Sequence, residues 1–398
     1  MTLDADVLIA GAGPAGCAAG IRLAEAGFDV LMVERDPMDA GPDITSGEVL
    51  ALGTQLECAS LGVSLDEDWA YGRMRFVRNV YPDLSWTLHA VPEGMGHIHV
   101  DRGGFNAALR ARAALAGARL RCGETVTAVD LADGAMIRTR GGAEYRGHVL
   151  IDASGRNSVA LNSLCLKESE SEFQQIGVAL FFSSFEGTPD DTWDRHLYGE
   201  HGAMISGSKI RSGLYRYILE ADLADKKAGK LKPVEYFTHV ARTHDPWIAE
   251  RLASEPRIGQ AWAMAPLAYR ARDIVRDRLL LIGDASGYLS PITGQGIEFA
   301  MRMGRLAADS VSTALRRHDL TAPAFRGYVD GRASEVIAMM QVVRSQLRFF
   351  RDRDALLRCA TDDDFRAKFL LALPVVDHGS LLDEIHGPRA GDAAPVPL

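Results

Sequence analysis

The chain has 398 residues, a formal net charge of -9 at pH 7, and 47% hydrophobic against 24% charged residues. This length favours two or three domains of roughly 100–200 residues each, and the composition is typical of a globular protein. The acidic balance argues against nucleic acid as a partner, and no apolar run reaches the roughly 20 residues that a membrane span needs. The five cysteines form no CxxC pair, so we expect a cytoplasmic protein with no membrane span, disulfide framework or metal centre.

The N-terminal residues predict a strand, a glycine-rich turn, a helix and a second strand. An apolar run at 7–10 leads into a GxGxxG motif at Gly11, Gly13 and Gly16, and a second apolar run at 30–33 ends at Glu34. In this motif the first glycine makes the tight turn, the second lets a pyrophosphate approach the backbone, and the third lets the helix pack on the strand. The free N–H groups at the helix start favour an anion. Glu34 is placed to accept hydrogen bonds from a ribose.

The middle of the chain interrupts this α/β pattern with alternating segments. Period-two alternation predicts strands at 73–80, 85–90 and 97–100, before an amphipathic helix at 101–116. Further strands are predicted at 120–122, 125–129, 149–151, 177–182, 214–219 and 278–282. Helical patterns follow at 296–315 and 335–357, and the Pro-rich residues 387–398 are expected to be mobile.

Two consecutive motifs near residue 290 point to a cofactor. Gly283-Asp284-Ala285-Ser286-Gly287 is followed by Pro291-Ile292-Thr293-Gly294-Gln295-Gly296-Ile297. With the GxGxxG turn, they resemble the FAD superfamily of para-hydroxybenzoate-hydroxylase-like monooxygenases, geranylgeranyl-reductase-like enzymes and flavin-dependent halogenases. In that superfamily the aspartate binds the ribityl chain of FAD. The next turn begins a helix whose positive end stabilises negative charge on the reduced flavin.

Two more segments resemble the same superfamily. Val100-Asp101-Arg102 is similar to its arginine-bearing segment near FAD, and Asp152-Ala153-Ser154-Gly155 is similar to its DG motif, which touches FAD and the nicotinamide cofactor. From the residues alone, Arg102 could equally lie on a helix surface and Asp152 could cap a turn. The resemblance implies these FAD-binding residues: Gly11, Gly13, Gly16, Glu34, Arg35, Arg102, Val126, Asp152, Gly155, Gly283, Asp284, Pro291, Gly294, Gln295, Gly296 and Ile297.

The motif positions imply an α/β fold, α+β overall, with interleaved domains. We expect a Rossmann-like FAD-binding domain from residues 1–72, 100–158 and 268–328. An antiparallel β-sheet substrate domain is expected from 73–99 and 159–267. Residues 329–398 are expected to form C-terminal helices and a mobile tail.

The electron donor has no dedicated domain, because no second GxGxxG follows a strand. Reducing equivalents are therefore expected from NADH or NADPH docking transiently, or from a partner flavin reductase. The sequence does not choose between these donors.

Three chemistries share the resembled scaffold. Halogenases of this kind use a lysine and tend to carry WxWxIP, whereas here the first lysine is Lys167 and WxWxIP is missing. The YxWxFPK substrate motif of geranylgeranyl-reductase-like enzymes is also missing, although the flavin segments look closer to theirs. The leading interpretation is therefore a monooxygenase that hydroxylates or epoxidises an electron-rich, secondary-metabolite-like substrate through a flavin C4a-hydroperoxide. The alternatives are a reductase or dehydrogenase of a carbon–carbon double bond, a halogenase, and a non-catalytic flavoprotein.

Four residues are candidates for catalysis. Pro291 and Thr293 are expected beside the flavin edge, and Glu48 follows the first loop that flanks the flavin. His99 alternates with His97 on a predicted strand and could tune a substrate hydroxyl, although a structural histidine is the commoner case. The substrate, either a free small molecule or one tethered to a carrier protein, is not identified by these residues.

Overall fold

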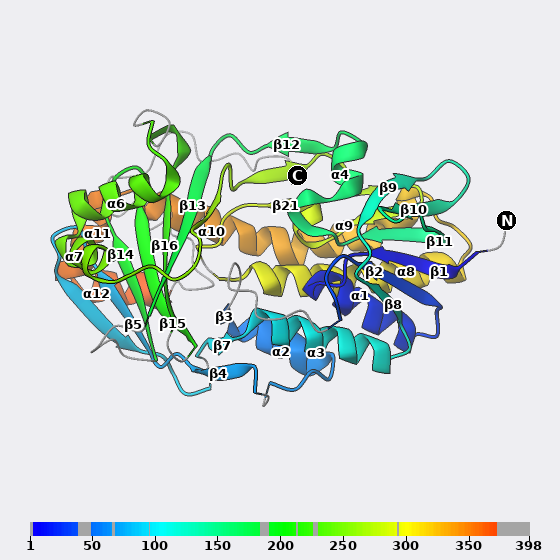
Figure 1. The fold of residues 1–398 in the computed structure, drawn as a ribbon, viewed down its shortest axis with the longest axis horizontal. Helices are drawn as coiled ribbons and strands as arrows, with labels where there is room; N and C mark the ends of the chain where they lie inside the picture. Colours follow the sequence, from blue (N-terminus) through cyan, green and yellow to red (C-terminus); the bar gives the residue numbers. More distant parts are fainter. Residues whose placement is uncertain are drawn as a thin grey trace. The chain divides into compact units, whose positions relative to one another are not determined.

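The computed structural model describes residues 3–38, 49–65, 68–94, 96–183, 191–211, 214–225, 230–292 and 294–371 (Figure 1). The chain divides into two compact units, each assembled from three stretches. The first unit contains Met1–Tyr71, Val100–Glu170 and Ala268–Ile337, and the second contains Gly72–His99, Ser171–Leu267 and Ala338–Leu398. Of residues 329–398, which were expected to form a C-terminal helical element, 329–337 are grouped with the first unit and 338–398 with the second.

The first unit is built around a sheet of eight described strands that contains the expected strand–helix–strand unit. The main path runs β19-β20-β11-β1-β2-β8, and β10 pairs with β11 and β9. β1 lies parallel to β2 and to β11, and Val7, Leu8 and Ile9 are fully buried, as expected for a strand covered on both faces. The strands are β1 (Ala5–Ala10), β2 (Val30–Glu34), β8 (Arg119–Cys122), β9 (Val126–Asp130), β10 (Ala135–Thr139), β11 (Glu144–Asp152), β19 (Val275–Arg276) and β20 (Leu279–Leu281).

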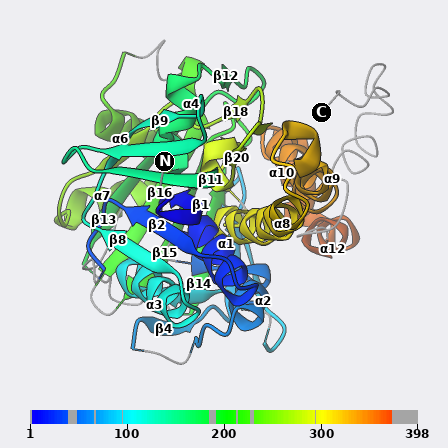
Figure 2. The same ribbon diagram turned by 90° about the vertical axis from the view of Figure 1, so that its right-hand side faces the viewer.

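Two helices of the first unit pack unusually closely. α1 (Pro14–Glu25) and α8 (Gly296–Arg316) lie side by side in Figure 2. A Cβ built on Gly304 of α8 would lie 2.4 Å from the Ala15 carbonyl oxygen, so only glycine permits this approach. The other helical segments are α2 (Leu52–Ser60), α3 (Arg102–Leu115), α4 (Val159–Ser163), α9 (Arg326–Arg332), a π-helical turn at Ala333–Ile337, and the 3₁₀ turns η1 (Gly155–Asn157), η2 (Gly283–Ser286) and η3 (Ala322–Phe325).

Short strands form two further sheets. One three-stranded sheet has the order β12-β18-β21 and another has the order β3-β7-β4. Their bounds are β12 (Lys167–Ser169), β18 (Tyr269–Ala271), β21 (Gly287–Tyr288), β3 (Val49–Leu50), β7 (Ile98–Val100) and β4 (Ala70–Arg73).

The second unit is built on a sheet of seven described strands, with the order β17-β13-β16-β15-β14-β5-β6. Neighbours are antiparallel except β14 and β5, which are parallel. One face carries a core of buried side chains that includes Phe237 and Ile248 of α6 and α7. The elements are β5 (Phe76–Val80), β6 (Trp86–Ala90), β13 (Gln175–Phe182), β14 (Thr192–Leu197), β15 (Met204–Arg211), β16 (Leu214–Asp222), β17 (Trp262–Met264), α6 (Pro233–His244), α7 (Pro246–Ser254), α10 (Ala338–Phe349), α11 (Arg353–Thr361) and α12 (Asp363–Leu371).

The predicted fold class is confirmed, and the local differences have physical reasons. His97 was expected on a strand with His99, but it directly precedes β7. Its carbonyl accepts a hydrogen bond from the N–H of Met74, the residue after β4, so pairing at this position lies just beyond the assigned strand ends. The helical region expected at 335–357 begins as a π-helical turn. It is divided at Asp352, whose side chain caps the next helix by accepting from the Ala355 N–H.

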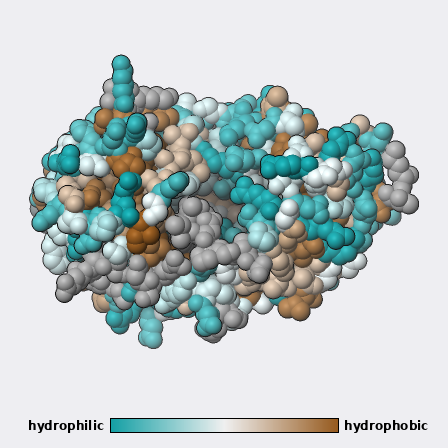
Figure 3. Space-filling model, in the orientation of Figure 1, coloured by the Kyte–Doolittle hydropathy of each residue, from teal (hydrophilic) through white to brown (hydrophobic). Residues whose placement is uncertain are grey.

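The described surface and helices have the composition of a folded globular chain. In the view of Figure 3, hydrophilic residues are spread over much of the described surface, as is usual for a folded domain. Within the described residues, none of the helices combines the length and the apolar composition needed to cross a bilayer.

Replacing Gly304 by alanine should destabilise the protein, because the new methyl group meets the Ala15 carbonyl at 2.4 Å and the Ala18 side chain at 2.8 Å. We expect Gly304→Ala to lower the free energy of unfolding, measured in urea, by about 1–3 kcal/mol. The control is Gly327→Ala in α9, where the nearest atom lies at 3.7 Å and the helix propensity of alanine adds up to about 1 kcal/mol. Equal stability of the two variants would contradict the close packing of α1 and α8.

Candidate functional site

The turn between β1 and α1 depends on glycine at two places. Gly11 has φ +97°, a conformation that favours glycine, and its N–H donates to the Val33 carbonyl at 2.8 Å. A Cβ on Gly16 would lie only 2.0 Å from the Gly11 carbonyl oxygen. These contacts hold the start of α1 directly against the end of β1, as the motif predicts.

Gly13 has a different role in the same turn. Its φ of -80° is available to any residue, and a Cβ there would meet nothing within 4 Å. It is the N-cap of α1, makes no side-chain capping bond, and precedes a first turn without acidic residues. The open space therefore lies before uncapped backbone N–H groups, which is the arrangement that accommodates a phosphate.

Glu34 closes the turn from the end of β2. Its buried carboxylate accepts hydrogen bonds from the N–H groups of Ala12 at 2.6 Å and Asp36 at 3.0 Å. Each oxygen retains a further lone pair, so a ribose contact remains compatible with this position. The neighbouring Arg35 is exposed and lies 3.6 Å from the Asp36 carboxylate.

Arg110 supports the same turn and was not identified from the sequence. It is 1% exposed on α3. Its Nη1 donates to the Pro37 carbonyl at 2.7 Å and its Nε donates to the Ala12 carbonyl at 3.3 Å. The only sequence signal is an arginine within an amphipathic helix, which ordinarily indicates a solvated face.

The loop after β11 lies beside the glycine turn. Asp152 accepts hydrogen bonds from the Ser154 N–H at 2.9 Å, the Ser158 hydroxyl at 2.6 Å and the Ala160 N–H at 3.0 Å, and also from the Ser154 hydroxyl. These four donors show that Asp152 organises its own turn. Gly155 follows with φ +77°, and a Cβ there would meet nothing within 4 Å.

The η2 turn contains Asp284, the predicted ribityl-binding residue, and lies against the start of α1. Gly283 has φ +58°, and a Cβ on it would lie 3.0 Å from the Ala15 side chain of α1. Burial raises the pKa of the Asp284 carboxyl to about 6, while the positive charges of Arg156 and Arg102 act in the opposite direction. The Tyr269 hydroxyl donates to the Asp284 carbonyl at 2.6 Å. Asp284 and Arg102 therefore lie together with Arg156, which was not among the predicted binding residues.

The segment before α8 is shaped by a turn. The Gly294 N–H donates to the Pro291 carbonyl at 2.9 Å, and Gly294 has φ +68°. A Cβ on Gly294 or on Gly296 would meet nothing within 4 Å. Gln295 is the N-cap of α8 and makes no capping bond to its own helix start, and Ile297 is buried.

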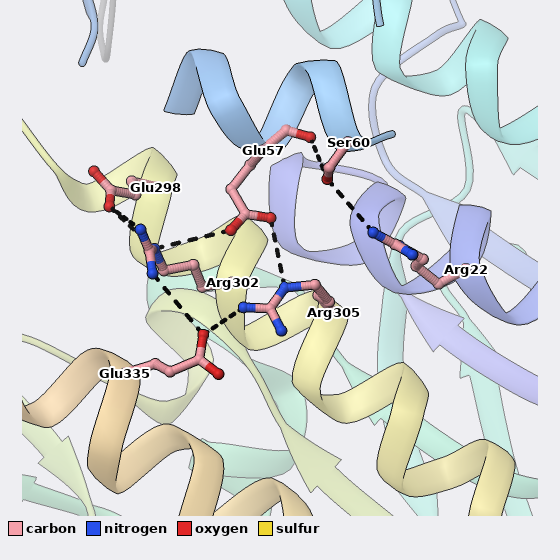
Figure 4. Close-up of polar contacts among 7 residues, drawn as sticks. All are labelled: Arg22, Glu57, Ser60, Glu298, Arg302, Arg305 and Glu335. Carbon is pink, nitrogen blue, oxygen red and sulfur yellow. Dashed lines mark hydrogen bonds and ion pairs between the residues drawn. The ribbon is translucent and has the colours of Figure 1, made fainter. Parts of the chain in front are cut away.

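A charged network fixes the first turns of α8 (Figure 4). Arg302 Nη2 lies 2.9 Å from Glu298 Oε1, and Arg305 Nε lies 3.7 Å from Glu57 Oε2 of α2. Both arginines also pair with Glu335 in the π-helical turn. Burial raises the pKa of the Glu298 carboxyl, while Arg302 lowers it. The network therefore joins three helical segments behind the glycine-rich start of α8.

The remaining predicted residues are placed as follows. Val126 begins β9 and packs against the core of the first unit. His99 is 4% exposed in β7 and is grouped with the second unit. Glu48 and Thr293 lie outside the described residues. The catalytic roles of Pro291, Thr293, Glu48 and His99 stay predictions.

These features fit FAD. The open space at Gly13 faces uncapped N–H groups that suit a pyrophosphate. The buried Asp284 carboxyl, flanked by arginines, suits the ribityl hydroxyls. The described residues therefore provide both an anion-binding end and a hydroxyl-binding end.

Gly13→Ala should weaken FAD binding without weakening the fold. The new methyl group enters space that is open in the folded chain, so the thermal midpoint of the flavin-free protein should not change. We expect the affinity for FAD to fall at least about tenfold, because each charge-assisted hydrogen bond to a phosphate contributes about 1.5–3 kcal/mol. FAD titration followed by flavin fluorescence measures this. Gly141→Ala, with its nearest atom at 3.9 Å, is the matched control, and equal affinities would contradict the assignment.

The pKa of Asp284 predicts a pH-dependent stability. The folded protein retains a proton up to about pH 6, whereas an unfolded aspartic acid releases it near pH 4. The contribution of Asp284 to the stability of the flavin-free protein should therefore fall as the pH rises from about 4 to 6, by up to about 3 kcal/mol. Asp284→Asn should remove this loss. Urea unfolding of both proteins across this range tests it, and parallel pH profiles would contradict it.

The chain is similar over most of its length to known enzymes and to a solved structure. The 1H-pyrrole-2-carbonyl-[peptidyl-carrier protein] brominase of Pseudoalteromonas luteoviolacea (strain 2ta16) is 29% identical over 362 residues, which cover 87% of this chain and 85% of the relative. Digeranylgeranylglycerophospholipid reductase 1 of Methanothermobacter thermautotrophicus (strain ATCC 29096 / DSM 1053 / JCM 10044 / NBRC 100330 / Delta H) is 25% identical over 349 residues, which cover 81% and 80%. The solved structure of the flavin-dependent brominase Bmp2 has a TM-score of 0.79 over 96% of this chain and 98% of that chain, at 21% identity.

The family comparison covers more than half of the chain. The family described as FAD dependent oxidoreductase matches residues 6–250, a range that includes the glycine turn, Glu34 and Asp152. The structural similarity to Bmp2 shows the same fold. The chain belongs to the family of FAD-dependent oxidoreductases.

Proposed function

We propose that the protein is an FAD-dependent monooxygenase that transfers one oxygen atom to an electron-rich acyl group held on a peptidyl carrier protein. The carrier-tethered substrate is supported most by the 29% identity, over 87% of the chain, to an enzyme named as a brominase of a pyrrole-2-carbonyl group on such a carrier. Oxygen transfer is supported by the sequence, which has no lysine before Lys167. Pyrrole is an electron-rich ring, the kind of substrate expected from the sequence. FAD, when bound and reduced, supplies the activation of dioxygen.

In this proposal the residues of the first unit hold and orient the cofactor. The N–H groups after Gly13 bind the pyrophosphate, and Glu34 accepts from the ribose. Asp284 accepts hydrogen bonds from the ribityl chain, and Arg102 and Arg156 favour its charged form. The start of α8 places a positive helix end toward the flavin, and the network around Arg302 keeps that helix end in place.

Halogenation is the second candidate, because the relative just named is a brominase. Halogenases of the resembled superfamily use a lysine, and Lys167 is the one lysine within the sequence stretches of the first unit. Its Nζ lies 4.3 Å from the centre of the Tyr269 ring, and burial and Arg156 lower its pKa. Oxygen transfer remains first, because the stretch after 46–48, where the halogenase lysine is expected, contains none.

The test is a reaction on a loaded carrier protein. The FAD-loaded enzyme is given pyrrole-2-carbonyl-loaded peptidyl carrier protein, dioxygen, bromide, and NADH or NADPH with a flavin reductase. Intact-protein mass spectrometry of the carrier should show one added oxygen atom, in equal yield without bromide. Lys167→Met should leave this product unchanged.

Other products would overturn the proposal in distinct ways. Replacement of a ring hydrogen by bromine, lost in Lys167→Met, would establish the halogenase. Addition of two hydrogen atoms without dioxygen would establish a reductase, the activity for which the digeranylgeranylglycerophospholipid reductases are named. If a parallel reaction with free pyrrole-2-carboxylate yields the oxygenated acid while the loaded carrier stays unmodified, the tethered substrate is excluded.

A further inference from the structure

One face of the second-unit sheet carries a polar row that does not belong to the cofactor site. The strand register pairs Asn79 of β5 with Thr87 of β6 and with Arg195 of β14, which in turn pairs with Ser206 of β15. Paired residues project to the same face of a sheet. The adjacent positions, such as Ile205, project to the opposite face, where the apolar core includes residues of α6 and α7.

Arg195 and Asn79 form a buried, hydrogen-bonded pair that retains unsatisfied donors. Arg195 is 3% exposed and Asn79 is fully buried. Arg195 Nε donates to Asn79 Oδ1 at 2.8 Å. Arg195 Nη2 and Asn79 Nδ2 are buried and have no hydrogen-bond partner among the described residues. Both of these free groups are donors, so they match an acceptor and not another donor.

The surroundings of the pair leave the positive charge uncompensated. Burial lowers the pKa of Arg195 to about 10, which still leaves the guanidinium charged at neutral pH. Its titratable neighbours Tyr81 and Cys359 have pKa values that burial raises, so both are neutral there. The ion pairs recorded among the described residues give Arg195 no carboxylate partner within 4.0 Å.

Aromatic rings lie beside Arg195. The Arg195 guanidinium lies 5.3 Å from the centre of a Trp193 ring, and the His97 ring lies 5.7 Å from that ring. Burial, and next the charge of Arg195, lower the pKa of His97 to about 4, so His97 is neutral at pH 7. The site therefore offers one positive charge and one amide donor next to flat rings.

We propose that Arg195 and Asn79 bind the acyl oxygen of the substrate, and that the substrate is an aromatic acid or its carbonyl derivative. A buried donor without a partner costs about 1–3 kcal/mol, and a buried unpaired charge costs more. A carboxylate or thioester carbonyl oxygen between Arg195 Nη2 and Asn79 Nδ2 removes this cost. The inference rests on the proposed function for the identity of the acyl group, but it concerns binding alone.

The experiment measures binding to the oxidised, FAD-loaded protein, where no turnover occurs. The probes are pyrrole-2-carboxylate and neutral pyrrole-2-carboxamide, titrated by calorimetry. Both should bind to the wild type, the first representing a free acid and the second the carbonyl of a tethered substrate. Arg195→Met should lower the affinity for both probes by about tenfold or more, because hydrogen bonds to charged groups contribute about 1.5–3 kcal/mol. Tighter binding of the carboxylate favours a free acid, and tighter binding of the amide favours a tethered acyl group.

Two further variants keep the inference testable if Arg195→Met does not fold. Asn79→Asp places a carboxylate beside Arg195, so the variant should retain the fold. Its affinity for pyrrole-2-carboxylate should fall at least tenfold, because the new carboxylate neutralises Arg195. Arg75→Gln is the matched control, since Arg75 is 72% exposed and pairs with Asp191 at 2.6 Å, and it should bind like the wild type.

Some results would overturn the inference independently of the catalysed reaction. If neither probe binds to the wild type, or if Asn79→Asp and Arg195→Met bind the probes as tightly as the wild type does, the unpaired donors contact only water. If both probes bind as expected while the carrier assay yields a brominated or reduced product, the acyl-oxygen site stands and the monooxygenase proposal fails.

Discussion

The start of α1 is confined by main chain instead of side chains, and the architecture of the first unit depends on that constraint. The Gly11 carbonyl lies where a Cβ of Gly16 would be, and Gly283 and Gly304 bring η2 and α8 against Ala15. Three chain segments can approach one helix end only because these positions lack a side chain. The space left open before Gly13 is therefore bordered by backbone donors with fixed geometry.

Two groups of buried polar side chains differ in how they are satisfied. In the first, Asp152 receives four donors and Arg110 donates to the carbonyls of Ala12 and Pro37, so these groups are satisfied within the protein. In the second, Arg195 and Asn79 keep donors without partners among the described residues. Buried polar groups are ordinarily satisfied, and the two unsatisfied donors that lie side by side next to a buried charge are therefore the basis of the proposed acyl-oxygen site.

The glycine turn was predictable because its signal is local, whereas the groups proposed to bind the substrate were not. Gly11, Gly16 and Gly283 act through contacts that their spacing along the chain already indicates. Arg195 and Asn79 become informative only after β14 pairs with β5, a register between strands far apart in sequence. Arg110 and Arg156 were missed for the same reason. His97 was assigned to a strand because alternation alone does not show where the hydrogen-bonded ladder begins.

The interleaved order of the two units has a consequence for the synthesis of the chain. β20 pairs with β11, and α8 covers α1 through Gly304, yet both β20 and α8 come from the last third of the sequence. Contacts between such distant segments form slowly, because a long loop must close first. The nascent N-terminal segment therefore exposes an incomplete parallel sheet until residues 279–316 leave the ribosome. An incomplete sheet with unpaired strand edges is generally prone to aggregation, so the order of synthesis makes this interval the most vulnerable stage of folding.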